Sequence, residues 1–168
     1  MLNEFDNLMN FTERMDLLFD ELNKGEPMTL FQLITDARKF FSESFPFQTI
    51  DLDGSEATVT INNGTWLQIV LRELLSNAAE ADGDRVRLSW SLDKSLIVII
   101  ENSGECFQED IPVNPPVPFS TRKGRHDGLG LSIIQRIVET LNGHFELKYT
   151  DNTTVATIVI PPEELIHE

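Results

Sequence analysis

The stretch LRELLSNAAEA, from Leu71 to Ala81, combines the periodicity of a buried helix with two polar residues at a fixed spacing. Glu73 and Asn77 are four residues apart, so a helix brings them to one face. The neighbouring face is apolar, with residues Leu67, Val70, Leu71, Leu74 and Ala78. Asn is disfavoured in a helix interior, but its amide oxygen is a good ligand for Mg²⁺, a cation that proteins share with phosphates. The pattern indicates either a Mg²⁺ ligand at Asn77 or a solvated polar face.

A second stretch, PFSTRKGRHDGLGLSII at residues 118–134, places basic residues and glycines before an apolar run. The residues concerned are Arg122, Lys123, Arg125, Gly128 and Gly130. The apolar run predicts a helix from Leu129 to Leu141. A basic loop that leads into a helix N-terminus suits an anion, because free backbone N–H groups and the helix dipole both favour negative charge there. This stretch predicts a phosphate site, with an ordinary surface loop as the alternative.

The composition excludes several classes of protein. The 168 residues suit one domain, and 40% hydrophobic residues are enough for a core. A net charge of −15 argues against a nucleic-acid-binding surface. The one cysteine, Cys106, fits a reducing compartment. The sequence shows neither a signal peptide nor an apolar stretch of the roughly 20 residues that span a membrane. We therefore expect a cytoplasmic segment, and a longer protein that contains it could be anchored to a membrane elsewhere.

The order of predicted elements indicates the fold class. Helices are expected at residues 2–24 and 29–42, then at 65–81 with Thr65 as N-cap, and at 129–141. Strands are expected in TIDLDG and ATVTIN, joined by a turn at Asp53-Gly54, then in RVRLSWSL and SLIVIIEN, and in a final hairpin of HFELKYT and TTVATIVIP. This order predicts an α+β two-layer sandwich, with one mixed β-sheet covered by helices on one face and an N-terminal helix in front.

Several motifs occur together in the order of a known family. The chain resembles the ATP-binding catalytic domain of sensor histidine kinases, within the superfamily that includes gyrase-type ATPases, Hsp90 and MutL. LRELLSNAAEA resembles its asparagine box, IIENSGECF its first glycine box, PFSTRKG its phenylalanine box with a lid lysine, and HDGLGLSII its second glycine box. TTVATIVIP resembles the closing strand. The resemblance covers residues 25–162 and implies a Bergerat-type ATP-binding fold, with residues 163–168 as a tail.

The resemblance implies roles for individual residues. It places the Mg²⁺ ligand at Asn77, and Lys123 in the lid that covers ATP. Glu73 is expected to polarise a water or the attacking nucleophile, with a plain helix carboxylate as the alternative. The expected nucleotide contacts are Asn77, Ala81, Asn102, Gly104, Phe107, Lys123, Gly128, Leu129, Gly130, Leu131 and Thr154. The implied cofactors are ATP and Mg²⁺.

Three positions depart from the family pattern. Asn102 stands where the family has an Asp that accepts a hydrogen bond from the adenine amino group. An amide oxygen still accepts that bond, but without charge assistance. Cys106 replaces a glycine and could crowd the pocket, and His126 replaces another glycine, where an exposed lid residue is expected.

The N-terminal helix suggests how the chain meets its partners. Its residues Phe5, Leu8, Thr12, Met15, Phe19 and Leu22 form a stripe with the spacing of a helical hairpin. Residues 1–24 resemble the second helix of a kinase dimerisation hairpin, but the helix contains no histidine. We expect the phosphoacceptor histidine outside this segment, a response regulator as a further partner, and association through residues 2–24, with a homodimer as one form. Packing of the helix on its own domain is the alternative.

Other functions are also compatible with these residues. The departures at residues 102 and 106, and the missing histidine, would fit a degenerate module that binds nucleotide weakly and docks on a kinase hairpin or a response regulator. Asn77, Lys123 and the GLGL sequence favour a catalytic domain instead. A clamp of the gyrase or Hsp90 kind fits less well, because the chain has no transducer domain.

Overall fold

A five-stranded mixed sheet forms one layer of the protein. The computed structural model describes residues 2–81, 83–104 and 129–167. The sheet has the order β2-β4-β5-β7-β6, formed by Ile50–Gly54, Val86–Leu92, Leu96–Ser103, Thr153–Ile160 and His144–Thr150. β2 and β4 are parallel, whereas the other neighbours are antiparallel. The apolar strand β5 lies at the centre, as its sequence predicts.

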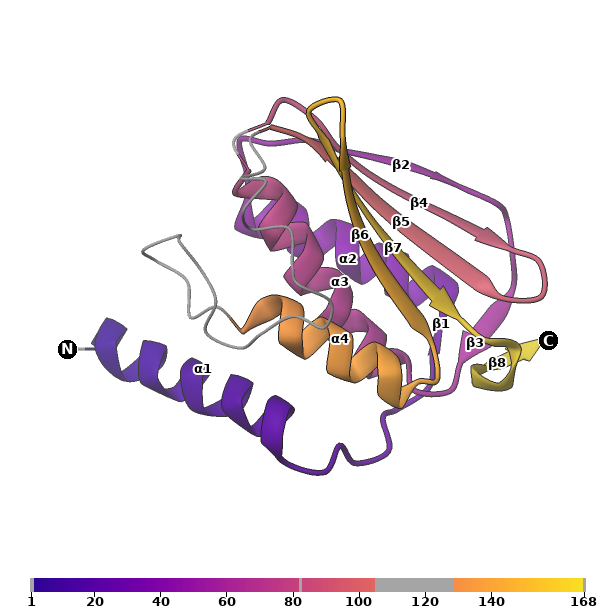
Figure 1. The fold of residues 1–168 in the computed structure, drawn as a ribbon, viewed down its shortest axis with the longest axis horizontal. Coiled ribbons are helices and arrows are strands. Elements are labelled where there is room, and N and C mark those ends of the chain that lie inside the picture. The colour runs from indigo at the N-terminus through magenta and orange to yellow at the C-terminus, as the bar shows by residue number, and fades with distance from the viewer. Residues whose placement is uncertain (1, 82, 105–128, 168) are drawn as a thin grey trace.

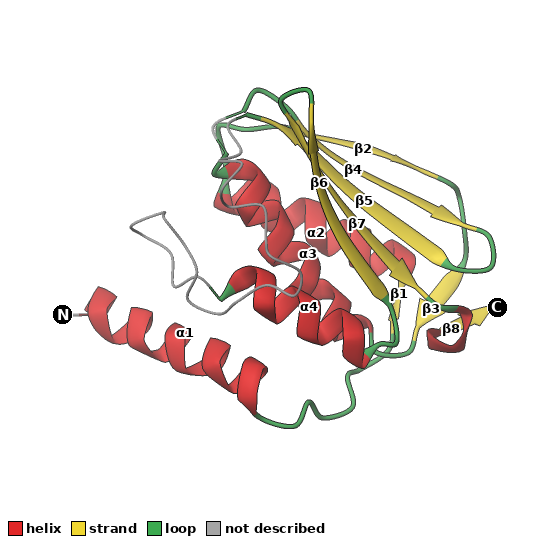
Figure 2. Cartoon of the chain, viewed as in Figure 1, coloured by secondary structure: helices red, strands yellow, loops and turns green. Residues whose placement is uncertain are grey.

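Three helices form the second layer and cover one face of this sheet. They are α2 (Leu30–Ser44), α3 (Gly64–Ala79) and α4 (Gly130–Thr140). Figures 1 and 2 show all three on the same side of the strands, with the other face of the sheet left open. The predicted two-layer α+β sandwich is therefore confirmed. None of the helices in the described ranges is both long and apolar enough to cross a membrane.

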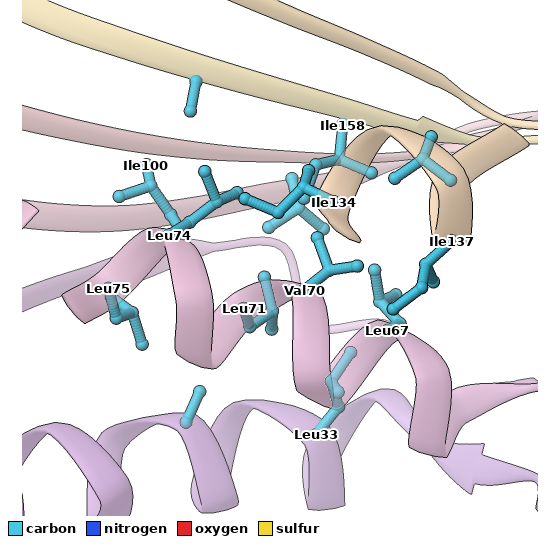
Figure 3. Packing of buried hydrophobic residues seen from close by; sticks show 14 of the residues in the cluster. Leu33, Leu67, Val70, Leu71, Leu74, Leu75, Ile100, Ile134, Ile137 and Ile158 are labelled. Atoms are coloured by element: carbon cyan, nitrogen blue, oxygen red, sulfur yellow. The ribbon is translucent and has the colours of Figure 1, made fainter. Parts of the chain in front are cut away.

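The hydrophobic core fills the space between the two layers (Figure 3). Alternate residues of β5, namely Leu96, Val98 and Ile100, are buried against the helices. α3 is the central helix of the core and contributes Leu67, Val70, Leu71, Leu74, Leu75, Ala78 and Ala79. Each fully buried Leu or Ile side chain stabilises the fold by about 1.5–3 kcal/mol relative to exposure. The burial of α3 on this face fixes which of its residues can face elsewhere.

A small second sheet has the order β1-β3-β8, formed by Met28–Thr29, Val59–Ile61 and Leu165–His167. The expected hairpin of TIDLDG and ATVTIN is therefore wrong, because β2 pairs with β4 whereas β3 pairs with β1 and β8. Alternation identified both strands but could not identify their partners. Residues 163–168 are expected to form a tail. In the structure they include β8, which follows a short 3-10 helix, η2 (Pro162–Glu164).

The helix starts differ in how well the sequence predicts them. Thr29 caps α2 with a capping box, since its hydroxyl accepts from the N–H of Gln32 and the Gln32 side chain accepts from the N–H of Thr29. Thr65 is not the N-cap of α3, because the helix begins at Gly64 after Asn63. The Thr65 hydroxyl instead accepts a hydrogen bond of 3.0 Å from the N–H of Glu26.

The N-terminal helix α1 (Leu2–Phe19) lies beside α4 at the edge of the helical layer (Figure 1). Leu18 is 8% exposed, and Met15 and Leu22 pack against the core. Phe19 belongs to the predicted stripe, yet it is 65% exposed. The side of α1 that faces the domain is the side that carries Leu18. The helix therefore packs on its own domain and leaves part of its apolar stripe uncovered.

Candidate functional site

The polar face of α3 points toward the start of α4. A Cβ atom placed on Gly130 would lie 3.0 Å from Oε2 of Glu73 and 3.9 Å from Nδ2 of Asn77. The apolar residues of α3 are buried in the core, and the four-residue spacing places Glu73 and Asn77 together outside that apolar face. Glu73 and Asn77 therefore share one face, as predicted, and meet the glycine at the beginning of the apolar helix.

Because Gly130 has no side chain, its backbone can lie close to the side chains of Glu73, Arg14 and Asn77. Mg²⁺ prefers oxygen ligands and is commonly held by one or two protein groups together with substrate phosphates. Within the described residues, no group of three or more His, Cys, Asp or Glu side chains gathers around a common point. An amide beside a carboxylate can supply one or two oxygen ligands, which fits a metal that is shared with a nucleotide rather than a metal held by protein alone.

Asn102 is one of two buried polar residues in the described chain, at 6% exposure. It lies near the end of β5 and is paired in register with Thr154 on β7. The alternation of β5 directs Asn102 to the same side as Ile100, which is the side that the helices cover. Its amide nitrogen donates to the carbonyl of Ser103 at 3.3 Å. The structure therefore brings together Asn102 and Thr154, two of the predicted nucleotide contacts.

Gly104 follows β5 in a conformation that favours glycine. Its φ is 124°, and a Cβ atom there would lie 2.3 Å from the carbonyl oxygen of Ala81 and 3.0 Å from the N–H nitrogen of Gly83. A side chain would thus be strained in backbone and blocked in space. The close approach brings Gly104, the residue that follows β5, against the segment that follows α3. Ala81 and Gly104, two further predicted contacts, are consequently neighbours.

The remaining predicted residues divide into two groups. Leu129 is fully buried just before α4, and Leu131 in its first turn is partly exposed. Phe107, Lys123 and Gly128 lie outside the described residues, as do the departures Cys106 and His126.

Arg14 of α1 is a residue of the site that sequence reasoning missed. It donates a hydrogen bond to Glu73 and forms an ion pair with it, with side chains 27% and 18% exposed. Its Nη2 atom would be 3.7 Å from a Cβ at Gly130, so the guanidinium borders the same corner as Glu73 and Asn77. Arg14 is the only basic residue among residues 2–23, but nothing in the local sequence indicates that it pairs with Glu73.

A hollow on the open face of the sheet contains none of these residues. It is lined in part by Asp53, Arg87, Trp90 and Glu101. A hydrogen bond to Asp53 and the charge of that carboxylate raise the pKa of Arg87 above its ordinary value. Arg87 also pairs with Glu101 at 3.9 Å. These mutual charge pairs give a structural account of the polar residues there, so the candidate site remains the corner between α3, α4 and the end of β5.

Comparison with known proteins places this corner in context. A family model described as histidine kinase-, DNA gyrase B-, and HSP90-like ATPase matches residues 62–164. The sensory histidine kinase/phosphatase NtrB of Rhizobium leguminosarum bv. phaseoli is 24% identical over 181 residues, which cover 94% of this chain and 47% of NtrB. The chain therefore spans about half the length of this curated relative.

Solved structures agree with the family model. The catalytic domain of histidine kinase ThkA, in a nucleotide-free form, superposes with a TM-score of 0.72 at 26% identity, covering 84% of this chain and 99% of that domain. ThkA in complex with the response regulator protein TrrA gives a TM-score of 0.75 at 25% identity, covering 97% of this chain and 50% of that chain. The second alignment extends over nearly the whole of the present chain.

Proposed function

Because the chain belongs to the histidine kinase-, DNA gyrase B- and HSP90-like ATPase family, we propose that it is the ATP-binding catalytic part of a two-component sensor histidine kinase. In this proposal residues 25–162 bind Mg·ATP and transfer the γ-phosphoryl group to a histidine outside the segment. Residues 1–24 are the end of a dimerisation hairpin. The convergence of Glu73 and Asn77 on Gly130 carries the proposal, since it brings an amide and a carboxylate together beside a residue that has no side chain.

The residues take the following roles. Asn77 offers its amide oxygen to Mg²⁺, and Lys123 of the lid neutralises phosphate charge. Bound Mg²⁺ would supply neutralisation of charge on the phosphates that are being separated. Glu73 orients the attacking group. Gly128 and Gly130 let the backbone approach the phosphates, because they carry no side chain.

The base of the nucleotide is proposed to lie at the end of β5. Asn102 would accept a hydrogen bond from the adenine amino group, with Thr154 on the neighbouring strand lining the same pocket. Ala81, Gly104, Phe107, Leu129 and Leu131 would complete the walls. The buried position of Asn102 supports this role, because a desolvated amide discriminates between bases better than an exposed one.

The partners follow from the same proposal. The phosphoacceptor would be a histidine-containing dimerisation domain, either in the rest of the same kinase or in another protein. A response regulator would receive the phosphoryl group, and the complex of the related ThkA with TrrA supports this expectation. A homodimer through residues 2–24 and a cytoplasmic location also belong to the proposal. The single cysteine is consistent with a reducing compartment.

Calorimetry with a non-hydrolysable ATP analogue tests the nucleotide site. We expect Mg²⁺ to tighten binding in the natural chain, and Asn77→Ala to remove most of that Mg²⁺ effect. Asn77→Asp is the matched control, since it keeps an oxygen ligand and should retain the effect. Equal affinity of the natural chain and Asn77→Ala in Mg²⁺ would contradict the assigned metal ligand. Absence of binding in all three proteins would favour the alternative, a docking module that does not bind nucleotide.

A further inference from the structure

Arg14 connects the N-terminal helix to the candidate metal corner. Its guanidinium pairs with Glu73, and both groups lie within 4 Å of the position that a Gly130 side chain would occupy. Asn77, the proposed Mg²⁺ ligand, lies at 3.9 Å from the same position. A cation that comes from α1 therefore already borders the corner in which a divalent cation would bind.

Apolar packing and hydrogen bonds hold α1 and the segment that follows it on the domain. Leu18 is the only residue of α1 in the buried core, among those that the structure describes. Beyond the end of the helix, Arg136 of α4 donates a hydrogen bond of 2.6 Å to the carbonyl of Asp20. The Trp66 indole donates to the carbonyl of Asn23 at 2.9 Å. The Arg14–Glu73 pair links α1 to the domain at the candidate site itself.

We propose that Arg14 is a latch that couples the docking of α1 to Mg²⁺ at Asn77. The positive charges of Arg14 and Mg²⁺ would repel each other in this corner, and both cations would bind oxygen atoms of α3 side chains. Docked α1 therefore disfavours bound Mg²⁺, and bound Mg²⁺ loosens α1, because coupling between two sites is reciprocal. Binding of Mg·ATP and docking of α1 on the domain would then be coupled equilibria. This inference rests on the proposed function.

The test compares binding of a non-hydrolysable ATP analogue in Mg²⁺ and in EDTA. The measured quantity is the factor by which Mg²⁺ tightens binding. Arg14→Gln should raise this factor about tenfold, within the range of known couplings between sites. Arg14→Lys keeps the charge and should stay near the natural value. Lys39→Gln removes the same charge from an exposed position on α2 and serves as the matched control.

A second variant and a second measurement separate a latch from a loss of stability. Leu18→Ala weakens the docking of α1 without changing charge, and it should raise the Mg²⁺ factor in the same direction as Arg14→Gln. Hydrogen exchange of the α1 amides should accelerate when the Mg²⁺-bound analogue is added to the natural chain, but not when the analogue is added in EDTA.

The outcomes distinguish this inference from the proposed function. An unchanged or reduced Mg²⁺ factor in Arg14→Gln, together with Mg²⁺-dependent binding, overturns the latch and leaves the nucleotide site intact. Unchanged exchange of α1 upon binding of the Mg²⁺-bound analogue also overturns it. If no variant binds the analogue under any condition, the proposed function and the latch fail together.

Discussion

Asn102 is the residue at which this chain departs most clearly from the histidine kinase pattern. We expect Asn102→Asp to tighten binding of an ATP analogue about fivefold, because a carboxylate forms a charge-assisted hydrogen bond worth about 1 kcal/mol more. Discrimination against GTP should also increase, since guanine presents a carbonyl to the new carboxylate. Calorimetry with both nucleotides provides the measurement.

The cost of burying a carboxylate opposes this gain. Asn102 is only 6% exposed, so an aspartate there needs N–H donors to remain charged. The backbone around Gly104 is the nearest source of such donors in sequence. Weaker ATP binding in Asn102→Asp would mean that the amide is adapted to this pocket, or that adenine does not lie beside it.

Gly104 permits a prediction about stability. Gly104→Ala should lower the free energy of unfolding by about 1–3 kcal/mol, because φ of 124° is strained for alanine and the methyl group would meet the Ala81 carbonyl. For a domain of this size, that corresponds to a decrease in Tm of roughly 2–12 °C. Thermal unfolding followed by circular dichroism measures it.

Asn142 provides the contrasting control. Its φ of 51° lies in the left-handed region that Asn tolerates, so Asn142→Gly should change stability by less than about 1 kcal/mol. Equal stability of Gly104→Ala and the natural chain would show that the loop after β5 relaxes. The sequence resemblance predicts a nucleotide contact at Gly104, whereas the close approach of Gly104 to Ala81 required the structure.

At the scale of elements, periodicity predicted helices and strands better than their partners. β4, β5, β6 and β7 occur as two antiparallel pairs, where short connections left few alternatives. β2 and β3 are also close in sequence, but they belong to different sheets. Alternation reports which face of a strand is buried, not which strand lies beside it. Long-range pairing of β3 with β8, about 100 residues apart, has no local signal in the sequence.

The helix α1 retains an uncovered apolar side that predicts association. Phe11 and Phe19 are 38% and 65% exposed, although both belong to a helix that packs on α4. We expect Phe19→Ser to weaken self-association of the chain, measured by sedimentation, because it removes exposed apolar surface without disturbing Leu18. Phe47→Ser is the matched control, since Phe47 is fully exposed outside α1. A natural chain that stays monomeric at high concentration would contradict association through this helix.

At the scale of the whole molecule, the sequence predicted the layers but not the relation between α1 and the site. Composition, periodicity and the order of motifs were sufficient for the sandwich. Glu73 and Asn77 were found because they share a helix, whereas Arg14 reaches Glu73 from a helix about 60 residues earlier. A contact across that separation depends on how α1 packs against α4, and no local pattern encodes it.

The placement of the two histidines in the described residues, His144 and His167, argues against phosphotransfer to either of them, and His126 lies outside those residues. His144 alternates with the buried Phe145 on β6, so its side chain faces the open side of the sheet, away from the helices that border the proposed nucleotide site. His167 is exposed on β8 of the small sheet. Both residues lie on strands, and neither lies on one of the helices that border the corner formed by Glu73, Asn77 and Gly130.

We therefore expect no acid-labile label on this chain when it is incubated with Mg²⁺ and radiolabelled ATP. Addition of a separate sensor-kinase hairpin that contains a histidine should give label on the hairpin, and Asn77→Ala should abolish that transfer. The matched control replaces the hairpin histidine by glutamine, which removes the acceptor nitrogen but keeps the helix. Stoichiometric label on His126, His144 or His167 would contradict the expected direction of transfer. It would mean that a histidine of this chain reaches the corner formed by Glu73, Asn77 and Gly130, either from the lid or from a second copy of the chain.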